Sequence, residues 1–441
     1  MIKVGMVSLG CPKNQIDAEL LLHTLVQNGF ALVEEAGMAE VAIVNTCGFI
    51  KDAKEESIAE ILELAQLKKE GKIKAIIVTG CMAERYRQEL LDELPEVDAV
   101  VGIGKNNHIV NIIHEAMEKS PVLAVGPKED LPLNGPRLLT TPPYMAYLKI
   151  SEGCDNRCSY CAIPSIRGGF RSRPMEEIVK EAEILAKKGV KELVLVAQDT
   201  TRYGADIYEK AILPDLCKKL CIVDGVEWIR LLYCYPQGID DELLQVMAAQ
   251  PKMAKYMDIP LQHCSKEVLK RMNRQGDEES LSALMEHIRN AVPGITLRTT
   301  VMVGFPGETE KDFTALSRFV NAMKFDRLGC FAFSPEEGTP AFDMADQLSD
   351  EVKEYRQRII MEQQMEIMQQ KLEAQQGQTM TVLVEGFDKY AGVFFGRSQS
   401  DAPEIDGKIF FTSGKTHKTG DFVTVTITDM MDYDLLGEEQ P

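Results

Sequence analysis

Three cysteines close together in the chain, Cys154, Cys158 and Cys161, have the residue type and spacing that most clearly indicate chemistry. Their spacing is C-x3-C-x2-C, and no fourth cysteine lies nearby. A four-iron cluster takes one thiolate per iron, so three ligands leave one iron open. An open ligand position also distinguishes catalytic metal sites from structural ones. A structural zinc site is less favoured, because no fourth Cys or His follows at zinc-like spacing.

A second set of three cysteines lies in the first quarter of the chain, each just after a short apolar run that predicts a buried parallel strand. The carboxyl ends of parallel strands meet at one edge of a sheet, where ligands bind. Three buried free cysteines are the simpler alternative, since cysteine is often buried. The repeated placement favours a second cluster, and the residues concerned are Cys11 after residues 4–9, Cys47 after residues 41–46 and Cys81 after residues 75–79.

Length and composition indicate a multidomain protein of the cytoplasm. The 441 residues predict two to three domains. No apolar run reaches the length of a membrane span, and the N-terminus has no signal-peptide pattern. In a reducing compartment, eleven cysteines indicate metal ligation instead of disulfides. We predict that Cys217, Cys221, Cys234, Cys264 and Cys330 pack in the core, because their spacing suits no metal.

Changes in pattern along the chain predict an α/β protein. Residues 1–126 alternate strand and helix signals and predict an open parallel α/β sheet, and prolines mark a linker at 127–143. Six longer strand–helix units follow in residues 144–349 and predict a partial (β/α)6 barrel with the Cys154 loop at its mouth. A connecting helix is expected at 350–376. Short alternating strands in residues 377–441 predict a small antiparallel β-barrel.

Charge bears on the partner of the protein. The net charge is −19, and residues 377–441 hold five bases and eleven acids, a net charge of −6. Affinity for nucleic acid comes mostly from Lys and Arg against phosphate, so RNA binding is not expected. The electrostatic field favours a basic protein instead.

Taken together, these features resemble the methylthiotransferases of the radical S-adenosylmethionine (SAM) superfamily over essentially the whole chain. The segments SLGCPKN at 8–14, CAIPSIRG at 161–168 and GRSQSDAPEIDG at 396–407 resemble the branch that modifies the twelfth protein of the small ribosomal subunit. The tRNA-modifying branch typically has Gln-Met-Asn after the first cysteine. An enzyme that modifies tRNA adenosine is therefore the alternative. An iron–sulfur electron carrier is less favoured, since it has no use for open irons.

The resemblance implies a fold and a reaction. The last barrel would be of the TRAM type, and the central barrel of the radical SAM type. Two [4Fe-4S] clusters, one on Cys154, Cys158 and Cys161 and one on Cys11, Cys47 and Cys81, would face one cavity. One would cleave SAM to a radical that removes hydrogen from the β-carbon of an aspartate, and the other would deliver sulfur. Because that C–H bond is not acidic, no general base is expected.

Other residues are predicted near the cofactor. Tyr160, before the third cysteine, is expected against the adenine, with core packing as the alternative. Strand ends at the barrel mouth offer candidates for SAM binding, namely Gln198, Asp199, Gln262, His263 and Arg298. A basic group close to the loop either balances anionic groups or forms a solvated patch, and its members are Arg167, Arg171 and Arg173. The expected partners are a basic small-subunit ribosomal protein, held by the acidic C-terminal barrel, and a flavodoxin- or ferredoxin-like electron donor.

Overall fold

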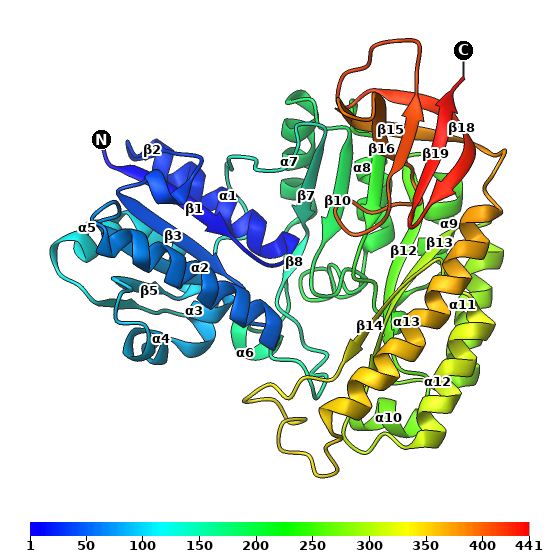
Figure 1. Cartoon of the computed structure of the whole chain (residues 1–441), viewed down its shortest axis with the longest axis horizontal. Helices are drawn as coiled ribbons and strands as arrows, with labels where there is room; N and C mark the ends of the chain where they lie inside the picture. The colour runs from blue at the N-terminus through cyan, green and yellow to red at the C-terminus, as the bar shows by residue number, and fades with distance from the viewer. Residues whose placement is uncertain (441) are drawn as a thin grey trace.

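The computed structural model describes residues 1–440, and its two parallel sheets and one β-barrel follow each other from blue to red in Figure 1. None of the helices within these residues combines the length and apolar composition needed to cross a bilayer. The α/β fold class with an open first sheet, a partial central barrel and a small C-terminal barrel is confirmed.

The first sheet is open, with all neighbouring strands parallel in the order β2-β1-β3-β4-β5-β6. Helices cover both faces, with α1 and α5 on one apolar cluster and α2, α3 and α4 on the other. Its strands are β1 (Lys3–Ser8), β2 (Ala31–Leu32), β3 (Val41–Thr46), β4 (Ala75–Gly80), β5 (Ala99–Val101) and β6 (Val122–Ala124). Its helices are α1 (Pro12–Gln27), α2 (Lys51–Lys69), α3 (Cys81–Tyr86), α4 (Gln88–Glu93) and α5 (Ile109–Glu118).

The second sheet has six parallel strands in the order β14-β13-β12-β11-β10-β7. Within the described chain the two edge strands, β14 and β7, do not pair with each other, so the barrel is incomplete. The strands are β7 (Met145–Lys149), β10 (Glu192–Val196), β11 (Trp228–Leu231), β12 (Met253–Gln262), β13 (Thr296–Val303) and β14 (Arg327–Ala332). A separate antiparallel pair, β8 (Ser151–Glu152) and β9 (Arg171–Ser172), flanks the Cys154 loop.

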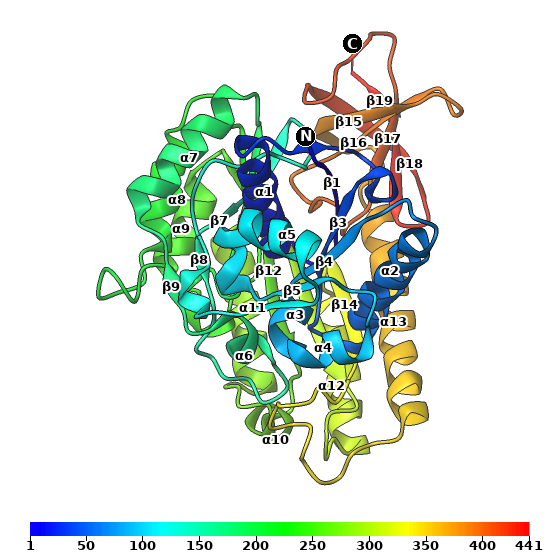
Figure 2. The same ribbon diagram turned by 90° about the vertical axis from the view of Figure 1, so that its left-hand side faces the viewer.

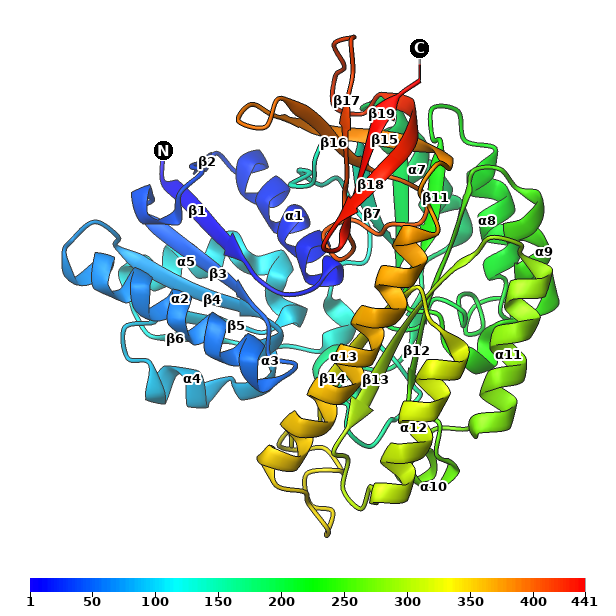
Figure 3. The same cartoon turned by 45° about the vertical axis from the view of Figure 1, so that its right-hand side comes forward.

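Helices cover the convex face of this sheet, and β15 to β19 form the closed C-terminal barrel. Figure 3 shows α13 running beside β14 and leading to that barrel. The helices are α6 (Ile163–Arg167), α7 (Met175–Lys187), α8 (Leu213–Cys221), α9 (Asp241–Ala249), α10 (Lys266–Arg271), α11 (Glu278–Ala291), α12 (Glu310–Met323) and α13 (Asp350–Glu373). The strands are β15 (Thr379–Asp388), β16 (Val393–Arg397), β17 (Ile409–Thr412), β18 (Phe422–Met431) and β19 (Asp434–Glu439).

The concave face of the partial barrel is covered by the other two parts of the chain. Side chains at alternate positions of each strand point to this face, and those of β7, β10 and β12 form one apolar cluster with residues of α1 and of the C-terminal barrel. Trp228 meets Phe422 edge-on, with ring centroids 4.9 Å apart. The N-terminal sheet lies in front of the barrel in Figure 2. The three parts are therefore packed into one body.

A buried ionic contact joins the C-terminal barrel to the start of β10. Glu192 is 0% exposed and accepts hydrogen bonds from Arg230 Nε at 2.8 Å and Arg397 Nη2 at 2.7 Å. Burial alone would raise the pKa of Glu192, but Arg397 and Arg230 outweigh this and hold the pKa below its ordinary value. The carboxylate therefore stays charged and fixes the position of the C-terminal barrel.

We predict that Glu192→Gln destabilises the protein. The substitution leaves the buried Arg230 guanidinium without a counter-charge and Arg397 with Glu385 alone, and removing one partner of a buried ion pair costs about 3 kcal/mol or more. Chemical denaturation of the variant measures the loss. Glu89→Gln is the matched control, because Glu89 is exposed on α4. Equal stability of the two variants would contradict a structural role for Glu192.

The same carboxylate predicts a pH dependence. Because its pKa is lower in the folded state, its stabilisation is complete above the pKa of the unfolded chain and is lost as the pH falls through the folded value. The stability gap between wild type and Glu192→Gln should therefore narrow on acidification.

Candidate functional site

The three N-terminal cysteines lie at one edge of the first sheet, as predicted. Cys11, Cys47 and Cys81 directly follow β1, β3 and β4, which are neighbouring strands. Gly10 lies between them at φ +91°, and a Cβ there would be 3.2 Å from Cys47 Sγ, so only glycine lets the two turns approach this closely. Burial, with a smaller contribution from Cys11 and Cys47, raises the pKa of the Cys81 thiol to about 12 against the opposing effect of Arg167.

The second set of cysteines lies in the loop between β8 and α6, at the carboxyl end of β7. A Cβ on Gly153, at φ +78°, would lie 2.0 Å from the carbonyl oxygen of Gly169, so glycine is required before Cys154. Ser159 N donates to Met272 O at 3.0 Å and anchors the loop to the barrel. Burial raises the pKa of Cys161 to about 12 and that of Cys154 to about 11.

Arg167 joins the two sets of cysteines. It ends α6, is 1% exposed, and its Nη2 donates to Cys81 Sγ at 3.1 Å and to Asn14 Oδ1 at 3.0 Å. Cys81 also packs against Ala162, the residue after Cys161, and Ile166. Cys81 of the first set therefore lies against α6, the helix that directly follows the second set, at the junction of the N-terminal sheet and the barrel mouth.

Four buried charged groups stabilise this junction. Lys149 contacts Asp17 and lies 2.8 Å from Glu152 Oε2, and Arg167 contacts the same two carboxylates. Burial alone would raise the pKa of Glu152, but Lys149 and Arg167 outweigh this and lower it to about 2. The Glu152 carboxylate therefore remains charged, and each side of the junction supplies part of the network.

A second ionic contact closes the junction beside Cys47. Glu336, from the loop after β14, is 3% exposed and accepts from Lys54 Nζ and Arg85 Nη1, both at 2.8 Å. Arg85 also donates to the carbonyl oxygen of Gly48 at 2.9 Å. The N-terminal sheet is therefore held to both edges of the barrel sheet.

The residues present suit iron–sulfur clusters by the chemistry of their donor atoms. Thiolates are the usual ligands of these clusters, and each set offers three. Within residues 1–440 no group of three or more His, Cys, Asp or Glu side chains converges closely enough for a single metal ion. A cube of four irons spreads its thiolates over separate irons, so it does not require that convergence.

Gln198 lies beside the Cys154 loop, two residues after the end of β10. Its Nε2 donates to Glu152 Oε1 at 2.5 Å, while its buried Oε1 has no hydrogen-bond partner among residues 1–440. A buried acceptor that lacks a donor is costly, and the ammonium group of SAM would supply one. Tyr160 packs partly against the barrel core and lies beside Arg274 and Cys158.

The predicted position of Arg298 at the barrel mouth is wrong. Arg298 is the third residue of β13, and its guanidinium lies 3.1 Å from Asp406 Oδ1 of the C-terminal barrel and 3.6 Å from Asp258. Two carboxylates already engage this side chain, because it faces the packed concave surface and not the strand end. We therefore leave Arg298 out of the cofactor site.

The basic group does not form a solvated patch. Arg167 and Arg173 are buried, and Arg173 Nη2 lies 2.7 Å from Glu181. Arg171 donates to the carbonyl oxygens of Lys128 and Glu129 in the linker. Of the three, only Arg167 contacts a predicted cluster ligand.

Of the remaining strand-end candidates, Asp199 contacts the Cys154 loop, whereas Gln262 and His263 lie together at the end of β12. Asp199 accepts from Asn156 of the Cys154 loop at 2.9 Å and from Thr201 at 2.6 Å. Gln262 and His263 are buried at the end of β12, and burial lowers the pKa of His263 to about 4, so its ring is neutral. His263 Nδ1 accepts from Ser265 N, and its Nε2 has no partner.

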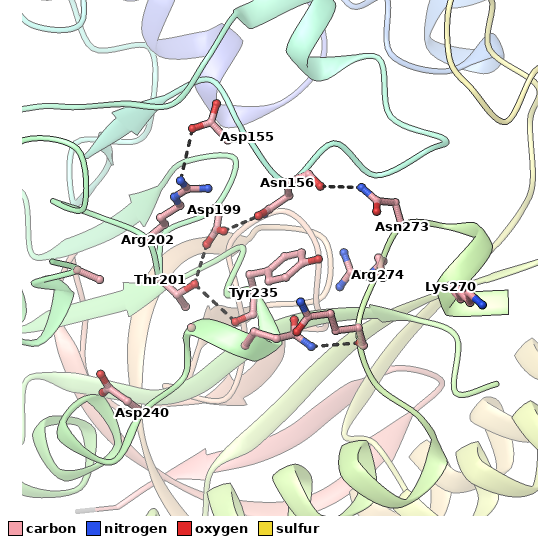
Figure 4. A pocket seen from close by; sticks show the side chains of 14 residues that line it. Asp155, Asn156, Asp199, Thr201, Arg202, Tyr235, Asp240, Lys270, Asn273 and Arg274 are labelled. Carbon is pink, nitrogen blue, oxygen red and sulfur yellow. Dashed lines mark hydrogen bonds and ion pairs between the residues drawn. The ribbon is translucent and has the colours of Figure 1, made fainter. Parts of the chain in front are cut away.

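A cavity of about 700 Å³ opens beside the Cys154 loop (Figure 4). Asp155, Asn156 and Asp199 line it together with Tyr235 and Arg274. The Arg274 guanidinium stacks 4.4 Å from the Tyr235 ring centroid and lies 3.7 Å from Cys158 Sγ. The volume is in the range that small organic ligands occupy.

Sequence reasoning missed several residues of the site. Asn14 Nδ2 donates to the carbonyls of Leu9 and Thr46 and so ties together the two turns that carry Cys11 and Cys47. Asp17 lies three residues after Asn14 on α1, and this helical spacing, which places the two side chains on one face, can be seen in the sequence. Arg274 lies more than a hundred residues from Cys158, and no local signal could have found it.

We predict that Arg167→Met weakens the junction in the metal-free chain. The change leaves Asp17 and Glu152 short of one counter-charge, which we expect to lower the free energy of unfolding by about 3 kcal/mol. Chemical denaturation measures this. Arg171→Met is the control, since Arg171 forms no ion pair within residues 1–440. If both variants unfold alike, Arg167 does not hold the two parts together.

Comparisons with known proteins agree with this architecture. Residues 3–102 match the uncharacterized protein family UPF0004, residues 148–320 the radical SAM superfamily and residues 377–439 the TRAM domain. The fold is similar to that of the radical SAM methyltransferase TsrM from Kitasatospora setae. The TM-score is 0.58 and the identity 15%, with 77% of this chain and 73% of that chain covered. At this identity the likeness shows the fold alone.

Closer relatives match over their full length. The ribosomal protein uS12 methylthiotransferase RimO of Pelotomaculum thermopropionicum is 51% identical, with 99% of both chains covered. The protein of that name from Thermoanaerobacter sp. (strain X514) is 49% identical, covering 99% of this chain and all of the relative. The chain therefore belongs to the RimO family of radical SAM methylthiotransferases.

Proposed function

We propose that this enzyme adds a methylthio group to the β-carbon of an aspartate in ribosomal protein uS12. The relatives that match the whole chain are named for uS12. The observation that carries the proposal is the contact between Arg167 and Cys81, since it brings the two sets of cysteines to one junction. A reaction that removes hydrogen and adds sulfur at the same carbon requires both functions at one place.

Each set of cysteines would hold one [4Fe-4S] cluster. Cys154, Cys158 and Cys161 would bind the cluster that cleaves SAM, and Cys11, Cys47 and Cys81 the cluster that provides sulfur. These groups supply the radical and sulfur chemistry that side chains cannot perform. The protein holds the ligands in place: Gly10 and Gly153 permit the close turns, and Arg167 donates a hydrogen bond to a ligand thiol.

SAM would bind on the Cys154 side of the junction. The unpartnered Oε1 of Gln198 and the adjacent cavity support this placement. Tyr160 remains a proposed contact because of its position before Cys161. A flavodoxin- or ferredoxin-like protein in the cytoplasm would supply electrons.

The C-terminal barrel would hold the substrate. Its net charge of −6 complements a basic ribosomal protein. This barrel contacts Glu192 at the start of β10, whereas Gln198, six residues later, contacts Glu152 beside the cysteine loop. At the rise of a strand these two contacts are about 20 Å apart, although one loop of the barrel reaches closer, where Tyr147 Oη donates to Glu404 Oε2 at 3.0 Å. The substrate would therefore reach the junction with a protruding loop.

The substrate assignment predicts which molecule gains mass. Reconstituted enzyme with SAM and a reductant should modify uS12, and mass spectrometry of a digest should place one methylthio group on an aspartate. Bulk tRNA, incubated in parallel, should remain unchanged because the acidic C-terminal barrel does not favour phosphate. If tRNA were modified and uS12 were not, the enzyme would instead be a methylthiotransferase of tRNA adenosine.

If the two clusters have the separate roles proposed above, Cys81→Ala should separate SAM cleavage from methylthio transfer. The variant should still produce deoxyadenosine from SAM but transfer no methylthio group, and its iron content should fall from eight per chain toward four. Cys217→Ala is the matched control, since Cys217 is buried in the barrel core away from both sets. Methylthio transfer at normal yield by Cys81→Ala would exclude sulfur delivery from this position.

A further inference from the structure

The ammonium group of Lys13 is a charged group at the junction that the proposed function leaves without a role. Lys13 is 7% exposed, two residues after Cys11 on α1. Within residues 1–440 no carboxylate oxygen lies within 4.0 Å of its Nζ. Burying a charge without a counter-charge is costly, so a buried lysine usually has an anionic partner.

The neighbouring cations differ from Lys13 in this respect. Lys149 and Arg167 share Asp17 and Glu152 between them. Both carboxylates are therefore engaged by other cations. A further buried carboxylate near Lys13, Asp258, lies 3.6 Å from Arg298. Lys13 is therefore the buried cation here that has no carboxylate in direct contact within residues 1–440.

An aromatic ring holds the Lys13 ammonium in place. Its Nζ lies 3.3 Å from the ring centroid of Tyr233, just beyond the end of β11. Tyr233 has φ +61°, which is unusual for a large side chain, and its carbonyl oxygen accepts from Thr200 N at 3.1 Å. Such backbone strain is found at binding sites. The ring attracts a cation but does not neutralise it.

Lys13 lies where a substrate loop from the C-terminal barrel would arrive. A chain of polar contacts runs along the concave face from that barrel to Lys13: Asp406 to Arg298 at 3.1 Å, Arg298 to Asp258 at 3.6 Å, and Asp258 to Tyr233 N at 3.1 Å. Cys11 and Tyr233, on either side of Lys13, keep some exposed surface. A ligand can therefore approach the ammonium group at this point.

We propose that Lys13 binds the carboxylate of the target aspartate and so selects the residue that reacts. This inference rests on the proposed function. The β-carbon of aspartate is bonded directly to its carboxyl carbon, so a carboxylate held by Lys13 fixes the reacting carbon one bond away. A glutamate held in the same way would present its γ-carbon instead. The ammonium thus supplies both the attraction and the position.

Equilibrium binding tests this role. Fluorescently labelled uS12 and a variant with asparagine at the target position are titrated with the reconstituted holoenzyme, and anisotropy gives each affinity. For wild-type enzyme we expect the asparagine variant to bind about 100-fold more weakly, as is typical for a lost buried charge pair. Equal affinity for the two proteins would overturn the proposal whatever the enzyme variants do.

A double-mutant cycle then assigns the effect to Lys13. Lys13→Met should bind natural uS12 about 100-fold more weakly but show no further loss with the asparagine variant. Lys13→Arg should recover most of the affinity. Lys74→Met is the matched control, because Lys74 is exposed just before β4, at the end of the strand opposite Cys81.

The main alternative is that Lys13 only balances the charge of the cluster beside Cys11. In that case Lys13→Met would weaken the binding of natural uS12 and of the asparagine variant equally, and it would change the iron content or the redox potential of the enzyme. This outcome would overturn the proposal. The proposal is supported if Lys13→Met retains its iron and loses affinity only for natural uS12, which has aspartate at the target position. Failure of the proposed function is recognised separately, since wild-type enzyme would then leave uS12 unmodified.

Discussion

The buried charges between the N-terminal sheet and the barrel mouth are the interaction on which the rest of the structure depends. Asp17 belongs to the first part of the chain, and Lys149, Glu152 and Arg167 belong to the second. Pairs of this kind contribute modestly to stability compared with apolar contacts, but they are costly to break or shift. The network therefore fixes how the two sets of cysteines lie relative to each other more than it stabilises the fold.

The same residues serve structure and chemistry. Arg167 neutralises Asp17 with one nitrogen and donates to Cys81 Sγ with the other. Glu152 accepts from Lys149 and from Gln198, next to the Cys154 loop. Because Arg167 and Glu152 each have partners on different elements, a displacement of either part of the chain would disturb both sets of cysteines. The junction thus behaves as a single unit, although its residues come from distant segments.

Sequence patterns predicted the architecture well, because apolar runs and their spacing report burial directly. The strands before Cys11, Cys47 and Cys81 and the six barrel strands follow from such runs. The short strands β5 and β6 were missed, since three residues carry too little pattern. The cysteines were found because their spacing is specific. Lys13, Asp17 and Arg274 were not assigned roles, because a single charged residue acquires a meaning only from the partner that the fold brings to it.

Arg298 shows the limit of reading position from strand patterns. The sequence pattern does not distinguish a side chain at the start of a strand from one at its end. Here Arg298, near the start of β13, contacts the C-terminal barrel, whereas Gln198, after the end of β10, contacts Glu152 beside the cysteine loop. Alternation along the strand places Arg298 on the concave face, and the acidic loop of the C-terminal barrel then captures it. Knowing that this barrel folds back onto the sheet required the coordinates.

The separation between the acidic barrel and the cysteine junction has a consequence for selectivity. A deoxyadenosyl radical would attack many C–H bonds that it could reach, so an enzyme of this kind must restrict access by geometry. Since the ionic contacts hold the parts together, and the proposed docking surface on the C-terminal barrel would lie toward the far end of the strands, a compact surface of another protein bound there would not reach the junction. A substrate segment would reach the junction only if it projected far enough from its own domain. The length of the substrate loop would then help to determine which protein is modified.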